Sequence, residues 1–139
     1  MATPNGLNPF FDHPTLDTPI IVHQPQAINA TATATAGQVK SGYITSTSAA
    51  ATSITLPTGT LLGAELGAVQ GTVHELYIDN TAGANTVTIV VATNGILSAL
   101  ATAEADGAGL LTVPSGVTGR ARFTLMFSSP TAYTFTRTA

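Results

Sequence analysis

From residue 39 onward, the sequence is a succession of short runs rich in β-branched and aromatic residues, separated by turn-forming residues. The runs cover Val39–Thr47, Thr52–Leu56, Thr72–Asp79, Thr86–Ala92, Ile96–Leu100, Leu110–Val113, Arg120–Phe127 and Thr131–Arg137. Short strands at such spacing are typical of an all-β sandwich or barrel. We therefore predict an all-β fold, an antiparallel β-sandwich or a jelly-roll-like body, over residues 39–139.

Alternation of apolar and polar residues predicts which side chains enter the core. The inward sets are His74, Leu76 and Ile78; Val87, Ile89 and Val91; and Ala121, Phe123, Leu125 and Phe127. The outward sets include Val73, Glu75, Tyr77 and Asp79, and Arg120, Arg122, Thr124 and Met126. Because side chains alternate with a period of two along a strand, a slip of one residue would expose the core set. These patterns therefore specify the strand register.

Turn residues predict how the strands connect. Asn80–Asn85 and Ser128–Pro130 contain residues that favour tight turns, and both segments predict β-hairpins. One helix of a turn or two is predicted within Thr58–Val69, where Leu61, Leu62, Leu66 and Val69 could share a face. Gly63 and Gly67 shorten it, because each glycine costs about 1 kcal/mol relative to alanine in a helix.

Residues 1–38 read as an extended N-terminal arm and an Ala/Thr linker. Five of the eight prolines fall within the first 25 residues, and proline lacks the N–H that a helix or a central strand needs. The alternating segment Ala30–Ala36 predicts a linker or a weak edge strand, and Thr18–Gln24 predicts another edge strand. The arm keeps apolar side chains that we expect to contact a partner: Phe10, Phe11, Leu16, Ile20, Ile21 and Val22. They dock either on the chain's own body or on a neighbouring subunit or larger shell.

Charge and hydropathy exclude several classes of function. The chain has only four Lys and Arg against seven Asp and Glu, which gives a net charge of −3. A nucleic-acid-binding protein needs a basic patch, so we expect no nucleic-acid partner. The sequence has no apolar stretch long enough to span a membrane and no signal-peptide pattern. Its sparse charges favour a surface that is partly covered by a partner.

The sequence offers no motif for catalysis, metal binding or a cofactor. Its three histidines lack metal-ligand spacing, cysteine is absent, and neither a G-x-S-x-G turn nor a phosphate-binding loop occurs. Glu104 and Asp106 are carboxylates in a small-residue loop, and we interpret them as solvated charges rather than as a glycosidase pair. We therefore predict a non-enzymatic protein with no cofactor and no metal.

Three outward-facing residues of the body are candidate partner contacts: Tyr77, Arg120 and Arg122. Arg120 and Arg122 project on the same side of one strand. They are either neutralised by Glu75 or Asp79 on an adjacent strand or bridge to an acidic partner surface. Tyr77 could stack on a sugar, but a chain without tryptophan favours an intersubunit contact.

The central and C-terminal part resembles small virion proteins of tailed bacteriophages, especially head decoration (cement) proteins. The resemblance rests on Ile54–Thr58, Leu61–Val69, Leu76–Thr81, Asn85–Ile89, Gly119–Phe127 and Thr131–Arg137. It implies a β-sandwich or jelly-roll-like domain, commonly a homotrimer, that binds the outside of an icosahedral shell. It also implies that the partner is the major capsid protein, and that the protein joins the virion in the host cytoplasm.

We therefore expect a structural virion protein that stabilises the head by clamping neighbouring capsid subunits. One alternative is a receptor-binding fibre or tip domain, which would need an exposed recognition surface. A tail or head-completion structural protein is another, differing mainly in copy number and location. A small hydrolase acting through Glu104 or Asp106 has little support in the sequence.

Overall fold

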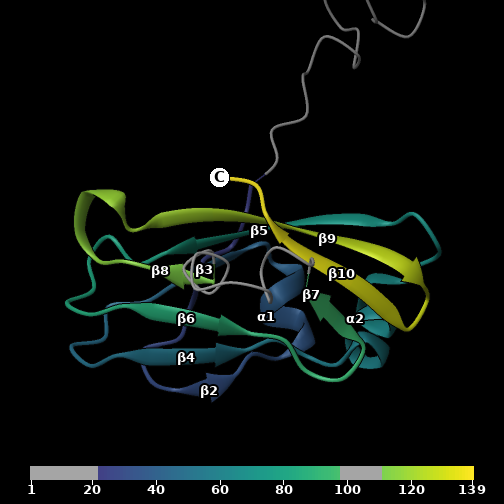
Figure 1. The fold of residues 1–139 in the computed structure, drawn as a ribbon, viewed down its shortest axis with the longest axis horizontal. Helices are drawn as coiled ribbons and strands as arrows, with labels where there is room; N and C mark the ends of the chain where they lie inside the picture. Colours follow the sequence, from purple (N-terminus) through teal and green to yellow (C-terminus); the bar gives the residue numbers. More distant parts are fainter. Residues whose placement is uncertain (1–21, 98–110) are drawn as a thin grey trace, which may run out of the picture.

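Within residues 22–97 and 111–139, the part of the chain that the computed structural model describes, ten strands form two β-sheets that pack face to face (Figure 1). The strands are β1 (Gln26–Ala27), β2 (Ala32–Thr33), β3 (Tyr43–Thr45), β4 (Thr52–Thr55), β5 (Val73–Asp79), β6 (Val87–Val90), β7 (Gly95–Leu97), β8 (Thr112–Val113), β9 (Arg120–Ser129) and β10 (Ala132–Arg137). The helices are α1 (Ala36–Lys40), α2 (Gly59–Leu66) and a 3₁₀ turn, η2 (Gly116–Thr118).

The chain alternates between the two sheets from β1 to β6. The large sheet has the order β1-β3-β5-β9-β10-β7, and the small sheet has the order β2-β4-β6-β8. Because successive strands of one sheet are joined through a strand of the other, each returns in the same direction as its neighbour. The pairs β1–β3, β3–β5, β2–β4 and β4–β6 are therefore parallel. The pairs β5–β9, β9–β10 and β6–β8 are antiparallel.

The predicted β-rich body is confirmed, but its strand pairing differs from the antiparallel expectation because both sheets are mixed. The predicted hairpin at Asn80–Asn85 is wrong: this segment carries the chain from β5 in the large sheet to β6 in the small sheet. Each of these strands already has two other neighbours, so they do not pair with each other. The hairpin at Ser128–Pro130 is confirmed, since β9 and β10 pair with Ala132 opposite Ser129.

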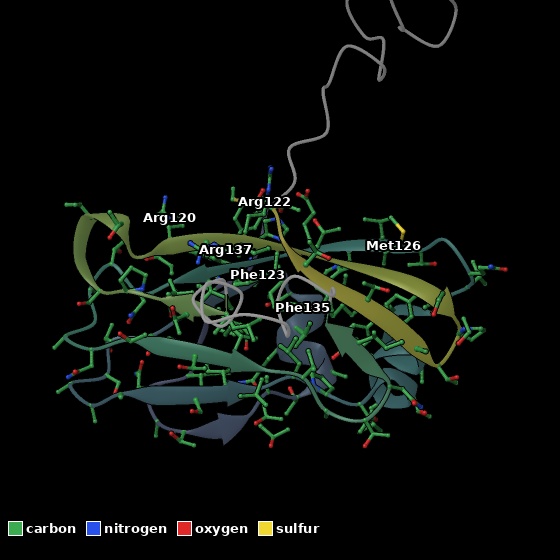
Figure 2. All side chains as sticks on the ribbon, in the orientation of Figure 1. Arg120, Arg122, Phe123, Met126, Phe135 and Arg137 are labelled. Carbon is green, nitrogen blue, oxygen red and sulfur yellow. The ribbon has the colours of Figure 1, made fainter. Side chains whose placement is uncertain are left out.

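Apolar side chains from both sheets form one core. The inward set of β9 is at most 1% exposed, and the rings of Phe123 and Phe135 stack with their centroids 4.8 Å apart. Figure 2 shows these two rings on the side of the large sheet that faces the small sheet, with Arg120, Arg122 and Met126 on the opposite side. Leu76, Ile78, Val87 and Ile89 are also buried as predicted. The half-buried His74 bonds through Nε2 to the Val39 carbonyl oxygen at 2.8 Å.

The packed body begins before residue 39. β1, β2 and α1 lie within the segment predicted as arm and linker, and Ile28 and Ala34 belong to the core. Val39 and Lys40 end α1 rather than begin a strand, because Thr35 starts a helix there. Its side chain accepts a hydrogen bond from the Gln38 amide, and the Gln38 side chain accepts one from the Thr35 amide.

Residues 1–21 and 98–110 lie outside the described residues. The predicted arm contacts Phe10, Phe11, Leu16, Ile20 and Ile21 therefore have no described position, and neither do Glu104 and Asp106.

Helix α2 lies within the predicted range and has the predicted length of about two turns. The predicted apolar face is wrong in part, because Leu62 is buried while Leu61 and Val69 are 61% and 63% exposed.

The Thr58 side chain accepts a hydrogen bond from the Leu61 amide at 3.3 Å, and the helix ends at Gly67 with φ +60°. Gly63 is buried against the turn between β9 and β10, where a Cβ atom would collide with the Pro130 carbonyl oxygen. A glycine is therefore needed where α2 approaches this turn.

We predict that Gly63→Ala lowers the free energy of unfolding by about 1–3 kcal/mol, because the new methyl group overpacks the contact with Pro130. The matched control is Gly37→Ala in α1, where the nearest atom to an added Cβ is the Thr35 Oγ1 at 4.0 Å. This control should leave stability unchanged or raise it by about 0.5 kcal/mol. Urea denaturation measures both variants, and equal stabilities would contradict the packing argument.

Candidate interaction surface

The outward face of the large sheet brings polar and aromatic side chains of β3, β5 and β9 into two cross-strand rows. The strand register places Tyr43, Tyr77 and Arg122 in one row. Thr45, Asp79 and Arg120 form the next row. Adjacent strands lie about 4.8 Å apart, so side chains within a row are in reach of one another. Figure 2 shows Arg120 and Arg122 on this face.

Asp79 holds the second row together. Its side chain is only 10% exposed and forms an ion pair with Arg120, whose Nη2 lies 2.8 Å from Asp79 Oδ2. Tyr43 donates its hydroxyl to the same oxygen at 2.6 Å. The other carboxylate oxygen accepts bonds from the Thr81 amide and hydroxyl at 3.0 and 2.6 Å. Three segments of the chain are therefore fixed on one carboxylate.

These bonds determine the protonation of the cluster. Burial of Asp79 alone would raise its pKa, but the hydrogen bonds from Thr81, Tyr43 and Arg120 outweigh burial and hold the pKa well below its ordinary value. The hydrogen bond to Asp79, together with burial, raises the pKa of the Tyr43 hydroxyl. At neutral pH the cluster consequently contains an ionised carboxylate, a neutral phenol and a guanidinium.

His23 packs against Tyr77 of the first row. Its ring centroid is 5.7 Å from that of Tyr77, and its Nδ1 bonds to the Ser41 carbonyl oxygen at 2.9 Å. Gly42, with φ +78°, leaves room for this ring, since an added Cβ would lie 2.5 Å from Nδ1. The preceding residue, Val22, is 71% exposed.

Two adjoining hollows follow this face. The first, about 440 Å³ in volume, is lined by Val22, His23, Tyr43, Tyr77 and Arg120. The second, about 300 Å³, is lined by Tyr77, Arg120, Ala121, Arg122 and Ala139. Because they share Tyr77 and Arg120, we treat them as one feature and name it the trough. Its lining combines two tyrosines with two arginines.

The structure places the predicted contact residues Tyr77, Arg120 and Arg122 together in the trough, and it adds Val22 from the predicted arm set. Arg120 is neutralised by Asp79, one of the two carboxylates considered from the sequence. Arg122 donates from Nε to the Thr138 hydroxyl at 3.2 Å. Their contact with a partner stays a prediction.

Sequence reasoning missed Tyr43 and His23 as parts of this surface. Tyr43 joins it only through the parallel pairing of β3 with β5, which the hairpin-based prediction did not contain. The predicted edge strand Thr18–Gln24 is wrong in its described part, since residues 22–24 form no strand, and His23 joins the surface through its ring contact with Tyr77. The signal that could have indicated Tyr43 is its position one residue before a buried isoleucine, the same position that Tyr77 has before Ile78.

In residues 22–97 and 111–139, no three or more His, Asp or Glu side chains gather in a way that could hold a metal ion. None of the helices in these ranges has the length and apolar character needed to cross a bilayer.

Comparison with known proteins found no matching family model, no similar curated protein and no similar solved structure.

We predict that Asp79→Asn lowers the free energy of unfolding at pH 7 by about 1–2 kcal/mol, because the amide cannot replace all the bonds to the carboxylate. The folded-state pKa of Asp79 lies below the unfolded-state value. Its stabilising contribution is therefore complete above about pH 4 and is lost as the pH falls below that value. Urea denaturation at pH 7, 5 and 3 should show the wild-type advantage at the first two values and its decline at the third.

The matched control is Glu75→Gln on the same strand, an exposed carboxylate with one long hydrogen bond, from the Tyr77 hydroxyl at 3.3 Å. It should change stability little at any of these pH values. An Asp79→Asn variant as stable as the wild type at pH 7 would show that the cluster does not stabilise the fold.

Proposed function

We propose that this chain is a structural virion protein that binds the outer capsid surface and stabilises the head by clamping neighbouring capsid subunits. Its partners would be the major capsid protein and copies of itself in a homotrimer. The proposal combines the sequence resemblance to head decoration proteins with a β-rich body whose charges are few. No enzymatic role is included in it.

One observation carries the proposal: the arm joins the body at the same exposed face as the predicted contact residues. Val22 lines the trough together with Tyr77 and Arg120. The 21 preceding residues could span up to about 70 Å when fully extended. One face of the body could therefore rest on one subunit while the arm reaches another.

The rest of this face suits burial against a protein surface. Val73 and Met126 are cross-strand neighbours on β5 and β9, and each is 52% exposed. The half-buried Thr124, Thr134 and Thr136 extend the face across β9 and β10. Contacts made only in the assembled shell would stabilise it by mass action, because they favour the assembled over the dissociated state.

The experiment that tests the proposal is imaging of purified particles with and without this protein, together with their resistance to heat. Hundreds of copies across the shell, with stripped particles weaker, would support a decoration role. A few copies at a vertex or tail, with no loss of robustness, would replace it with the fibre or completion alternative.

We predict that replacing both Phe10 and Phe11 by Ala weakens binding to stripped particles by about tenfold or more, because buried aromatic anchors dominate most protein interfaces. The melting temperature of the isolated protein should not change. Quantitative rebinding to stripped particles, followed by gel densitometry, measures the effect.

The control for this prediction is Val117→Ala, which truncates a fully exposed side chain in η2. It should bind particles like the wild type. Unchanged occupancy of the Phe10 and Phe11 variant would exclude the arm as an anchor.

A further inference from the structure

Val22, which follows directly after the arm residues 1–21, lies at the border of the trough. His23 is held by its bond to the Ser41 carbonyl oxygen and by contact with Tyr77. Val22, directly before it, lines the same hollow as Tyr43 and Arg120. Val22 also borders a larger hollow of about 750 Å³, whose charged lining residues are Lys40, Glu65 and Glu75, so the preceding residues can start along either hollow.

The charges of residues 1–21 and of the far end of the trough are complementary. Residues 1–21 contain two acidic residues, Asp12 and Asp17, and no Lys or Arg. The far end of the trough contains Arg122, which has no ion pair within the described part of the chain. Lys40, by contrast, is paired with Glu65 at 3.0 Å. An acidic residue of the arm is thus a suitable partner for Arg122.

Chain length allows this pairing. Asp17 precedes Val22 by five residues, which can span up to about 17 Å. The row of Tyr43, Tyr77 and Arg122 crosses three adjacent strands, or about 10 Å from first to last. A segment that starts at Val22 and crosses Tyr77 is therefore long enough to bring Asp17 to Arg122.

The intervening residues fit the lining. Pro19, Ile20 and Ile21 are apolar and lack long flexible side chains. Extended proline-containing segments bind grooves lined by aromatic rings, because such a segment loses little conformational freedom on binding. Tyr43 and Tyr77 provide such rings in the first hollow.

We propose that residues Asp17–Ile21 occupy the trough of their own chain, with Pro19–Ile21 over Tyr77 and the Asp17 carboxylate at Arg122. The arm then leaves the body beside Arg122 and Ala139 rather than at Val22. Only residues 1–16 remain to reach a partner, a span of at most about 55 Å. This inference concerns the isolated chain and is tested without particles. It revises the proposed function in one respect, since the filled trough, rather than the bare side chains of Tyr77 and Arg122, would then face the partner.

Disulfide trapping tests this docking, since the chain has no cysteine of its own. The test variant combines Thr18→Cys with Ala139→Cys, whose exposed position in the second hollow is bonded to the Arg122 backbone. The control combines Thr18→Cys with Glu75→Cys, an exposed position that lines the other hollow beside Val22 and lies outside the trough. We expect the test pair to form an intrachain disulfide about tenfold faster than the control pair under mild oxidation, because docking raises the local concentration.

Equal trapping rates for the two pairs would overturn the docking. A mixture of isotopically labelled and unlabelled test variant, analysed by mass spectrometry, identifies the chain that supplies the arm. Disulfides that join two chains would instead assign the trough to a second copy. Both double variants should keep the melting temperature of the wild type when reduced.

Charge exchange tests the pairing of Asp17 with Arg122. In the Thr18→Cys, Ala139→Cys background, Asp17→Arg should slow trapping about threefold or more, and adding Arg122→Asp should restore the rate. A rate that Asp17→Arg leaves unchanged, or that the second substitution fails to restore, would exclude this ion pair.

Discussion

The alternation of the chain between two sheets is the constraint on which the rest of the structure depends. Each passage adds one strand to the large sheet and one to the small sheet, so β1–β3–β5 and β2–β4–β6 form two parallel stacks around one core. Parallel neighbours cannot be joined by a tight hairpin. The backbone must therefore leave one sheet and enter the other at both ends of the strands, and its polar groups must be satisfied there.

At the two ends of the strands, different groups bond to the polar backbone atoms of the crossing segments. At the end that follows β2 and β4, threonines cap α1 and α2, and the buried Tyr133 donates its hydroxyl to the Pro57 carbonyl oxygen at 3.0 Å. Burial raises the pKa of Tyr133 to about 12, which keeps this donor protonated. At the opposite end, amide side chains bond to backbone. Asn29 accepts from the Thr47 amide, while Asn80 donates to the carbonyl oxygens of Asn85 and Val113. Polar side chains thus replace the sheet hydrogen bonds that the crossings give up.

Sequence reasoning succeeded where local periodicity decides the outcome and failed where long-range pairing does. The inward residues of β5, β6 and β9 follow from alternation, because a half-buried strand must place apolar side chains on one face. Asn80–Asn85 has the composition of a hairpin turn, yet the partners of β5 and β6 are set by burial of both sheets, which no local pattern encodes. Long-range strand pairing also explains why only part of the trough was predicted. Alternation predicts that Tyr77, Arg120 and Arg122 face outward, but only the parallel register brings Tyr43 beside them.

The Asp79 cluster orders three segments of the chain while the charges of Asp79 and Arg120 cancel. The nearly buried Asp79 carboxylate neutralises Arg120 of the same chain, so the pair adds little net charge to this face. Around it lie the half-buried Tyr43, Tyr77 and Arg122, the half-buried threonines of β9 and β10, and the exposed apolar pair of Val73 and Met126. Binding at Val73 and Met126 would depend on shape and apolar burial rather than on long-range attraction, so salt would weaken it little.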